Sequence, residues 1–514
     1  MGHLGFGKIA CVAAVFCVAN AVAGQAQTFT TLHSFDVSDG YSPYYGTLVQ
    51  GTDGNLYGTT TYGGTLNGNV GGNGTVFKIT RQGKLTTLYD FCAQTNNGVC
   101  ADGESAQAGV IQAANGKFYG TTAFGGNPYG VGGCINPDGC GTVFEMTPAG
   151  NLTTLYNFCS QANCADGASP EAAGLIQASN GNIYGATPLY ADNNGAVNGG
   201  TIFSIAPAGA LSTLFNFCYH APCPPGITPN TMVQAPNGAL YGTAAAGGAY
   251  KEGTFFVIGP NGKFTTLHSF NGLSEGADPG AVVSGNDGNF YGTTGNGGAN
   301  FYGTVFKITP AGQVTTLYNF CAQPGCADGA YPIAGLVQGS DGNFYGITVE
   351  GGNTAACADF RDNGCGTIFE ITPAGQFTSI YRFCSQTNCP DGVAPLAGLT
   401  QGTDGSFYGT SAFGGIYNAT CSDGCGIVFG ISTGLGEFVK SNPSLGRAGS
   451  KINILGNGLN GANSVTFNGT PATFQVISGT YIKAQVPSGA TTGTIVVTTP
   501  GGTLSSNVAF QVLP

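Results

Sequence analysis

Apolar and polar positions along this chain alternate in short runs that come in sets of four. One set reads GLVQG, NFYGIT, CGTIFEIT and FTSIYRF between residues 335 and 383. The runs are rich in Thr, Tyr, Phe, Ile and Val, as pleated strands are. An Asp-Gly-Asn turn at 341–343 separates the first two runs, and a Pro-Ala-Gly turn at 373–375 separates the last two. Because short Gly-bearing turns join hairpins, each set predicts a four-stranded antiparallel sheet.

The set recurs seven times, and a Tyr-Gly step in its second run marks each copy. The marking tyrosines are Tyr57, Tyr119, Tyr184, Tyr241, Tyr291, Tyr345 and Tyr408. Their spacing of about 50 to 65 residues is close to that of propeller repeats. No sustained helical period occurs outside the N-terminus. The pattern therefore predicts an all-β fold with a seven-bladed β-propeller, in which each set forms one blade.

The two ends of the repeat array are offset by one strand. A fourth-run sequence, TTLHSF at Thr30 to Phe35, precedes the first complete set, and the last set stops after its third run, CGIVFGIST. We expect the N-terminal run to pair with residues around Ile427 to Ile431 and so to complete the last blade. Closure removes the open sheet edges of an unclosed array. A linear solenoid is the competing fold, but it would not explain the matched offset.

The repeat motif, read as FYGTT, Gly-Gly and GTVFKITPAG followed by TTLYNF, resembles the GloVer tandem repeat of Gloeobacter and Verrucomicrobia. The resemblance covers about residues 27 to 433. It implies an exported or surface protein and carries no established chemistry to any residue of this chain.

Residues 434–514 have a different pattern, with alternating runs separated by Gly, Pro and Asn turns. Their length of about 80 residues suits one small immunoglobulin-like β-sandwich. The segment resembles an IPT/TIG domain at Pro443, Gly449, Gly456, Phe467 to Gly469, Pro487, Gly493 and Phe510. The resemblance implies a spacer or binding module. DNA-binding versions need basic loops, and the only basic residues here are Lys440, Arg447, Lys451 and Lys483, so no nucleic-acid partner is expected.

Composition agrees with a strand-rich exported protein. The chain has 514 residues, of which 90 are Gly, and its formal net charge is −11. The glycines stand at fixed offsets between apolar runs, so they are interpreted as turn residues rather than as a sign of disorder. Residues 1–26 resemble a cleaved signal peptide, with Lys8 before about 15 apolar residues; as a membrane anchor that stretch would be short. The expected location is secreted, extracellular or at the cell surface, or else periplasmic, with no later transmembrane segment.

Sixteen cysteines follow the signal, and each has one near neighbour in the sequence. The pairs are Cys92/Cys100, Cys134/Cys140, Cys159/Cys164, Cys218/Cys223, Cys321/Cys326, Cys357/Cys365, Cys384/Cys389 and Cys421/Cys425. Because the pairs are far apart, eight local disulfides are the simplest connectivity, and they suit an exported chain. Zinc sites are the alternative, but CxxC spacing is absent and histidines are few.

An acid-Gly pair precedes most first runs. The acids are Asp39, Asp102, Asp166, Glu275, Asp328 and Asp391, and the fourth set has Pro225 instead. One interpretation is a turn whose carboxylate accepts backbone N–H bonds. The functional one is a ring of carboxylates at the mouth of the central channel, which would hold a cation or a cationic ligand. Weak binding of calcium or another divalent cation is therefore left open, and no other cofactor is expected.

Catalytic motifs are scarce. His33 and His268 occupy equivalent LHSF runs, His220 lies between two cysteines, and no GxSxG, HExxH or P-loop sequence occurs. We predict a monomeric, non-enzymatic protein that binds or adheres to a glycan or another cell-surface partner through its long loops, which are expected to be acidic. The alternative is a polysaccharide hydrolase or lyase, which would need two carboxyl groups at a defined separation.

Overall fold

The structure, a computed structural model, describes residues 27–513 except 67–68, 71, 97, 129, 132–133, 135, 172, 189, 192–196, 219–222, 354–356 and 358–363. The expected signal peptide and His220 lie outside the described residues. Two short 3₁₀ turns, η1 (Ala162–Cys164) and η2 (Pro324–Cys326), are the only helical segments in the described ranges. Everything else that is regular is β-structure, as the sequence predicts.

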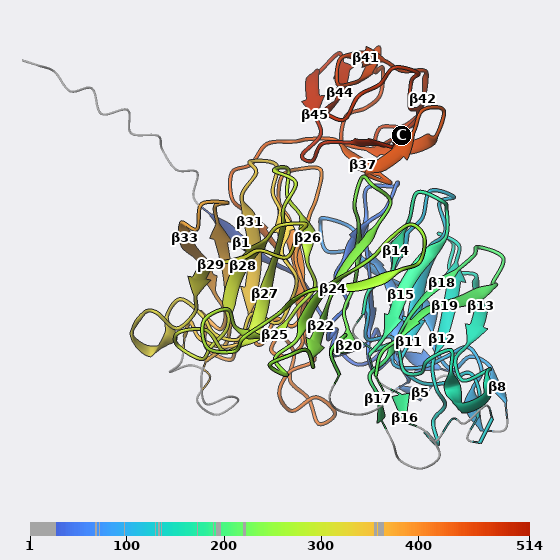
Figure 1. Ribbon diagram of the computed structural model, residues 1–514, viewed down its shortest axis with the longest axis vertical. Coiled ribbons are helices and arrows are strands. Elements are labelled where there is room, and N and C mark those ends of the chain that lie inside the picture. Colours follow the sequence, from blue (N-terminus) through green and yellow to red (C-terminus); the bar gives the residue numbers. More distant parts are fainter. Residues whose placement is uncertain are drawn as a thin grey trace, which may run out of the picture.

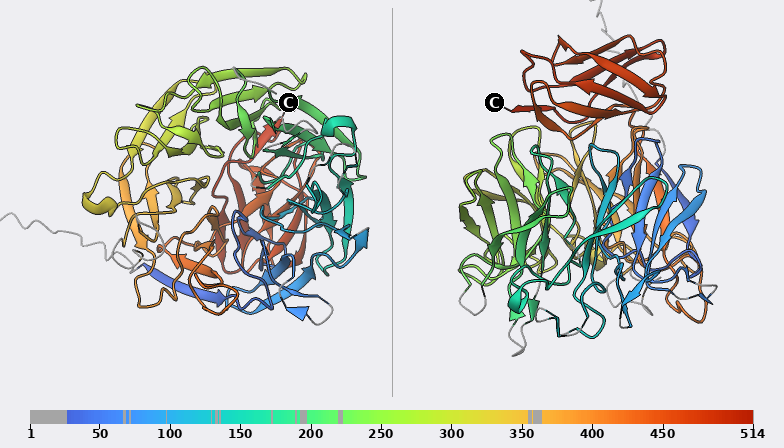
Figure 2. Two further views of the ribbon diagram at one scale, coloured as in Figure 1. Left: turned by 90° about the horizontal axis from the view of Figure 1, so that it is seen from below. Right: turned by 90° about the vertical axis from the view of Figure 1, so that its right-hand side faces the viewer.

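Seven antiparallel sheets, here numbered 1 to 7 in chain order, stand around a common centre and form a ring (Figures 1 and 2). Sheets 1 to 3 consist of β2 (Val49–Gln50), β3 (Leu56–Thr60), β6 (Thr75–Ile79) and β7 (Leu85–Asp90); β10 (Ile111–Gln112), β11 (Phe118–Thr122), β12 (Thr142–Met146) and β13 (Leu152–Asn157); and β14 (Ile176–Gln177), β15 (Ile183–Thr187), β18 (Thr201–Ile205) and β19 (Leu211–Asn216).

Sheets 4 and 5 each have five strands, because two short inner strands, instead of one, pair with the same neighbouring strand. They consist of β20 (Ile227–Pro229), β21 (Val233–Gln234), β22 (Leu240–Ala246), β23 (Thr254–Ile258) and β24 (Phe264–Ser269); and of β25 (Ala277–Pro279), β26 (Val283–Ser284), β27 (Phe290–Asn296), β28 (Thr304–Ile308) and β29 (Val314–Asn319).

Sheets 6 and 7 return to four strands. They consist of β30 (Val337–Gln338), β31 (Phe344–Thr348), β32 (Thr367–Ile371) and β33 (Phe377–Arg382); and of β34 (Thr400–Gln401), β35 (Phe407–Ser411), β36 (Ile427–Ser432) and β1 (Thr28–Ser34). The long loops carry three small hairpins, made of β4 (Thr65–Leu66) with β5 (Asn69–Val70), β8 (Thr95–Asn96) with β9 (Val99–Cys100), and β16 (Tyr190–Ala191) with β17 (Val197–Asn198).

The Tyr-Gly step is explained by close packing within and between sheets. A Cβ atom on Gly346 would lie 2.5 Å from Cζ of Phe369 on the neighbouring strand, so only glycine lets that ring lie across the strand. Tyr345 stacks on Phe407 of sheet 7 with ring centroids 4.0 Å apart. The hydroxyl of Tyr345 donates to Asp341 Oδ2 at 2.9 Å. The motif thus buries an aromatic ring between neighbouring sheets and satisfies its hydroxyl at the turn.

The N-terminal strand β1 pairs with β36 along its whole length, from Thr28 with Ser432 to Ser34 with Ile427. This confirms the predicted pairing of the chain's first strand with its last repeat. Sheet 7 then contacts sheet 1 through the same kind of core as other neighbours share, including Tyr408 and Val428 against Leu56.

A ladder of glutamines on the inner strands joins neighbouring sheets. Each glutamine side-chain oxygen accepts the backbone N–H of the turn in the preceding sheet. The bonds are Thr52 to Gln112 (2.9 Å), Ala114 to Gln177 (2.8 Å), Ser179 to Gln234 (2.8 Å), Asn286 to Gln338 (3.2 Å), Ser340 to Gln401 (2.9 Å) and Thr403 to Gln50 (3.0 Å). Sheet 5 has Ser284 at this position. The bond from Thr403 to Gln50 joins sheet 7 to sheet 1, so the two ends of the array meet like internal neighbours.

The C-terminal residues fold separately as a β-sandwich, called here the C-terminal sandwich (residues 438–513). Its strands are β37 (Lys440–Asn442), β39 (Lys451–Leu455), β43 (Tyr481–Gln485) and β42 (Phe474–Ser478) in one sheet; β41 (Thr470–Pro471), β40 (Ser464–Phe467), β44 (Ile495–Thr499) and β45 (Gly502–Ser505) in the other; and β38 (Leu445–Arg447) paired in parallel with β46 (Gln511–Leu513). Ile454, Phe467, Ile482 and Val497 lie in one core between the sheets. The fold agrees with the predicted sandwich.

Candidate functional site

The predicted acid-Gly residues lie beside the outermost strands of the sheets. Asp328 is fully buried and accepts three hydrogen bonds. The donors are the Tyr318 hydroxyl at 2.8 Å, the Ala322 N–H at 3.0 Å and the Gln323 N–H at 3.0 Å. Burial and this carboxylate raise the pKa of Tyr318. The carboxylate therefore ties a long loop to the fourth strand of the sheet that precedes it.

The same pairing recurs at six of the seven sheets, and the partner depends on the fourth-strand residue. Tyr89, Tyr156 and Tyr381 donate to Asp102, Asp166 and Asp391 at 2.6 to 2.7 Å. His33 Nε2 lies 2.6 Å from Asp39 Oδ2, and His268 Nε2 lies 2.9 Å from Glu275 Oε2. At sheet 3 both partners change together, to Phe215 on β19 and Pro225 on the following loop. The histidines are thus variants of a structural pair.

This geometry corrects the expected ring of carboxylates at the channel mouth. None of these six described acids lines the central cavity, and Asp102, Asp166, Asp328 and Asp391 are each 1% exposed or less. At least one oxygen of each accepts a hydrogen bond from the protein itself, although the second oxygen of Asp391 has no donor. The structure therefore favours the turn interpretation, and it removes four acids from the face that the sequence led us to expect to be strongly acidic.

Seven of the eight predicted disulfides are present, and each joins sequence neighbours on a long loop. They are Cys92–Cys100, Cys134–Cys140, Cys159–Cys164, Cys321–Cys326, Cys357–Cys365, Cys384–Cys389 and Cys421–Cys425. Three of them reach below the loop surface. Cys357–Cys365 and Cys384–Cys389 lie in a core cluster with Phe383 and Ile427, and Cys421–Cys425 lies in a cluster with Phe35. The long-loop face is thus the right location, but these three disulfides belong to the core beneath it.

The exception among the predicted disulfides is Cys218 with Cys223, which form no disulfide in the structure. Burial and the adjacent Cys218 raise the pKa of Cys223 to about 12. In the corresponding cysteine-containing loops after other sheets, the acid of the structural pair accepts hydrogen bonds from the backbone N–H groups that follow the first cysteine. The loop after sheet 3 has Pro225 in place of that acid and so lacks this acceptor.

Cysteine sulfurs also make up most of the groups that could hold a metal. Cys134, Cys140 and Cys159 come together in one such group, and Cys357, Cys365 and Cys384 in another. All six are bonded in disulfides, so they offer no thiolate ligand. These groups are therefore packed disulfides rather than a candidate metal centre.

A central cavity of about 1260 Å³ runs along the axis of the ring. The first strands of all seven sheets line it, and their wall residues are mostly apolar. Examples are Leu48, Val110, Leu175, Met232, Val282, Leu336 and Leu399. At the long-loop end the lining includes Tyr45, Thr228 and Asp278. Burial raises the pKa of Asp278, the one acid among the described lining residues at that end.

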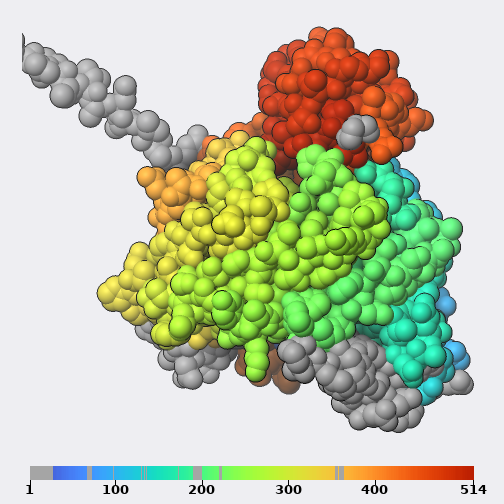
Figure 3. Space-filling view, viewed as in Figure 1, coloured from blue at the N-terminus to red at the C-terminus, as the bar shows by residue number. Residues whose placement is uncertain are grey.

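The C-terminal sandwich lies at the other end of the ring, on the side of the short turns (Figures 1 to 3), and lines that end of the cavity. It contributes seven lining residues: Lys440, Ser444, Leu445, Thr492, Val508, Ala509 and Gln511. Its contacts with the ring are made to the short turns of sheets 1, 2, 5 and 7. Asn442 Nδ2 donates to the Gln112 carbonyl at 2.6 Å, and the Thr480 hydroxyl donates to the Thr52 carbonyl at 2.8 Å.

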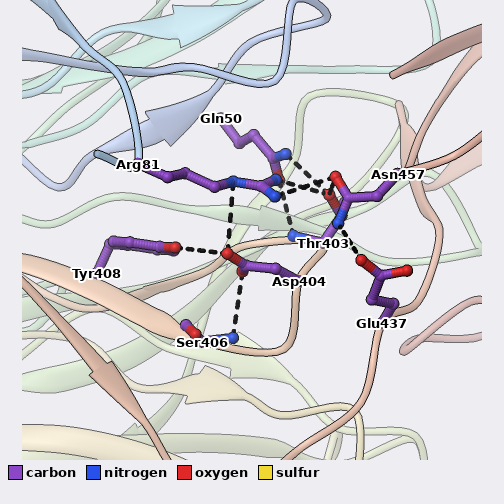
Figure 4. Close-up of polar contacts among 8 residues, drawn as sticks. All are labelled: Gln50, Arg81, Thr403, Asp404, Ser406, Tyr408, Glu437 and Asn457. Carbon is purple, nitrogen blue, oxygen red and sulfur yellow. Dashed lines mark hydrogen bonds and ion pairs between the residues drawn. The ribbon is translucent and has the colours of Figure 1, made fainter. Parts of the chain in front are cut away.

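Arg81 is the centre of the docking contact between sheets 1 and 7 (Figure 4). Its guanidinium donates to Asn457 Oδ1 and to Thr403 Oγ1, both at 3.0 Å, and its Nε lies 3.5 Å from Asp404 Oδ2. Asn457 Nδ2 in turn donates to Glu437 Oε1 at 3.2 Å. One side chain thus connects the first sheet, the last sheet and the C-terminal sandwich.

Arg81 is not among the candidate functional residues that the sequence analysis identified, although the sequence carries a signal for it. The turn between third and fourth runs contains Pro148, Pro207, Pro260, Pro310 and Pro373 in the other complete sets. Arg81 stands at the equivalent place in the first set. A charged residue that breaks an otherwise repeated proline indicates a contact that only one copy makes.

Exposed apolar side chains gather on the long loops. Of the large hydrophobic residues exposed in the described ranges, all but Ile477 lie there. The most exposed are Leu273 (74%), Phe301 (64%) and Tyr250 (62%). They belong to three loops of sheets 4 and 5 that contact one another, for instance through the Gly298 N–H and the Gly272 carbonyl at 2.9 Å. We call Tyr250, Leu273 and Phe301 the loop patch.

Glu104 is the long-loop acid whose ionisation is most strongly affected. Burial, followed by the charges of Asp138 and Asp102, raises its pKa to about 7. Asp138 itself is exposed.

None of the described residues forms a helix with the length and hydrophobicity that crossing a membrane requires. The family described as Gloeobacter/Verrucomicrobia repeat matches residues 22–228 and 190–429. The IPT/TIG domain family matches residues 438–512. No curated protein matches the chain.

Several solved structures are distantly similar. The extracellular domain of a putative one-component system from B. thetaiotaomicron has 11% identity and a TM-score of 0.45, and covers 95% of this chain and 58% of its own. A putative 6-phosphogluconolactonase from Bacteroides uniformis has 14% identity and a TM-score of 0.39, with 65% and 83% covered. A gluconolactonase from Xanthomonas campestris has 12% identity and a TM-score of 0.33, with 57% and 78% covered. Likenesses this weak carry no argument about activity.

Proposed function

The chain belongs to the Gloeobacter/Verrucomicrobia repeat family and carries an IPT/TIG domain, and from this membership we propose that it is an exported cell-surface protein that binds a glycan through its long loops. Seven disulfides in the described ranges suit an oxidising compartment outside the cytoplasm. The proposed mature chain consists of a repeat domain, residues 27–433, and the IPT/TIG domain, residues 434–514.

We also infer that the ring is a closed seven-bladed β-propeller. Two observations support this: the pairing of β1 with β36, and the glutamine bond from Thr403 to Gln50 that repeats the contact between internal neighbours. In such a fold the rigid sheets position loops at one end, where binding residues can vary without loss of the core.

The observation that carries the binding proposal is the loop patch. Exposed rings such as Tyr250 and Phe301 offer flat apolar faces, on which the CH face of a sugar ring can pack. Exposed apolar groups gathered on neighbouring loops of a soluble protein suit an interaction site. The neighbouring Lys251 and Glu252 supply hydrogen-bonding groups for hydroxyls. This combination suits a neutral or weakly charged polysaccharide.

Binding to an array of immobilised polysaccharides tests the proposal. We expect the full chain to bind at least one of them, and the double variant Tyr250→Ala, Phe301→Ala to bind at least tenfold more weakly. Ile477→Ala is the matched control, because Ile477 is 45% exposed but lies on the C-terminal sandwich; it should bind like the parent chain. A parent chain that binds no glycan, or a double variant that binds equally well, contradicts the proposal. Retention of cell-surface proteins alone would indicate a protein partner instead.

A second candidate function, polysaccharide hydrolysis, is favoured by Glu104. Hydrolysis of a glycosidic bond uses one protonated and one ionised carboxyl group. Glu104, with its pKa raised to about 7, and the exposed Asp138 offer such a pair. Release of reducing ends from polysaccharides by the parent chain, lost in Glu104→Gln, would support this function. No release by the parent chain excludes it and leaves the binding proposal untouched.

A further inference from the structure

Lys440 is the one cation among the described residues that line the central cavity, and the rest of that lining is mostly apolar. It belongs to β37, the strand of the C-terminal sandwich that faces the ring, and it lines the central cavity together with Leu445 and Val508. Desolvation alone lowers the pKa of its amino group, with no charged neighbour to offset it. A lysine in such a place is held at a cost in stability unless an anion neutralises it.

The described residues supply no such anion. Their ion pairs involve other cations, and none includes Lys440. Two of the described acids line the cavity. Asp287 is already bound to Lys307 at 2.7 Å, and Asp278 lies at the opposite, long-loop end. Among these residues, Lys440 therefore lines the cavity without a counter-ion.

The rest of the cavity restricts which kind of ligand could provide the counter-ion. Its volume of about 1260 Å³ exceeds that of a simple inorganic ion many times, and much of the wall is built from Val, Leu, Ile and Met side chains. Two of the polar wall residues are already bonded within the protein: Thr231 Oγ1 accepts the Gly174 N–H at 2.7 Å, and Gln234 Oε1 accepts the Ser179 N–H at 2.8 Å. An apolar body with one anionic group matches this surface better than a free sugar does.

We propose that the central cavity, lined at one end by the IPT/TIG domain, binds a small organic monocarboxylate whose carboxylate pairs with Lys440. The apolar body lies along the inner strands, and the IPT/TIG domain supplies the cation as well as part of the lining. This site is separate from the loop patch, and it does not rest on the proposed glycan binding.

Calorimetric titration of the full chain with 2-naphthoate and with its uncharged isostere 2-naphthamide tests the proposal. We expect 2-naphthoate to bind at least tenfold more tightly than 2-naphthamide. Lys440→Met should abolish that preference while keeping the apolar contribution, so both compounds should then bind alike. Lys451→Met is the matched control, since Lys451 is an exposed lysine of the same domain, and it should keep the preference.

Lys440→Gln provides a second variant, and thermal unfolding of each variant shows that it is folded. Equal affinity of the parent chain for the two compounds, or no heat from 2-naphthoate at millimolar concentration, overturns the proposal. So does a preference for 2-naphthoate that survives in both folded Lys440 variants. A preference that disappears in Lys440→Met and Lys440→Gln but persists in Lys451→Met supports it.

Discussion

At the residue scale, the repeat is held by pairs that change together. The fourth-strand residue and the loop acid are Tyr with Asp at four sheets and His with an acid at two, and at sheet 3 both polar partners are absent. A buried carboxylate without its donors, or a buried hydroxyl without its acceptor, is expensive, which explains why neither partner remains alone. The same reasoning explains why these acids are not free to bind a cation.

Removal of one member of such a pair should therefore destabilise the protein. We expect Asp328→Ala to lower the free energy of unfolding by about 2–4 kcal/mol, because three donors lose a buried acceptor. Chemical denaturation measures this. Tyr318→Phe should have a smaller effect, and the double variant should show coupling. If the two effects simply add, the hydroxyl and the carboxylate do not act as a pair.

Glu104 predicts a pH dependence of stability. Its pKa is raised to about 7 in the folded protein, above the ordinary 4.5, so the folded state binds the proton more tightly than the unfolded state. Stability from this group is present below about pH 4.5 and is lost as the pH rises to about 7. The unfolding temperature of Glu104→Gln should therefore exceed that of the parent chain by more at pH 8 than at pH 4.5. An equal difference at both pH values contradicts the raised pKa.

The close packing at the glycine of the Tyr-Gly step predicts that one added methyl group destabilises the protein. Gly346→Ala would place a Cβ 2.5 Å from the Phe369 ring, and we expect a loss of about 1–3 kcal/mol. Gly342→Ala is a useful comparison, because a Cβ there meets nothing but the backbone has a φ of +87°. Any loss of stability in Gly342→Ala would come from backbone strain alone. Equal stability of Gly346→Ala and the parent chain would mean that the ring can move aside.

At the scale of elements, the strands and their order could be predicted from the sequence, because apolar alternation and turn residues repeat seven times. The pairing of β1 with β36 followed from the offset at the ends. The roles of the acids could not be read from one set at a time: Asp328 and Tyr318 are 10 residues apart in the sequence and meet only when the loop folds back. Comparison of the sets, in which Phe215 and Pro225 change together, held the missing information.

The element-level prediction concerns β1. Deletion of residues 27–36 removes the fourth strand of sheet 7 and exposes the edge of β36, so we expect a clear fall in the thermal unfolding temperature. A chain that begins at residue 27 is the control and should unfold like the chain with its N-terminus. An unchanged temperature for the deletion would mean that β1 contributes nothing to the ring.

At the scale of the whole molecule, the position of the C-terminal sandwich at one end of the cavity was outside the reach of sequence reasoning. Its contacts come from short turns of sheets 1, 2, 5 and 7, which are spread along the chain and meet the sandwich at one end of the folded ring. Arg81 gives the one local indication, because it replaces a repeated proline and bonds both to Thr403 and to Asn457.

Arg81→Pro should separate docking from folding. Proline fits the equivalent turns of the other sets, so the ring should keep nearly its full stability, while the sandwich loses the bond from Arg81 to Asn457 and keeps the one from Thr480 to Thr52. We expect faster proteolysis of the connection at residues 433–437 and a larger maximum dimension in small-angle scattering. Lys84→Ala, on the same turn, is the control. Proteolysis at the parent rate in Arg81→Pro would show that the other docking contacts suffice.

Sheet 7 contains both ends of the repeat array, and this determines when the ring can be finished. Thr28 cannot pair before Ser432 has been synthesised, and Ser432 follows every other sheet in the sequence. Until then β1 is an unpaired strand and sheet 1 lacks a neighbour on one side, as does sheet 6 once it has been synthesised. The nascent chain therefore presents open edges for most of its synthesis or export. The hairpin turns within each sheet and the local disulfides of the long loops can form meanwhile. Assembly thus separates into an early phase of independent units and one late event in which the last repeat captures the first strand.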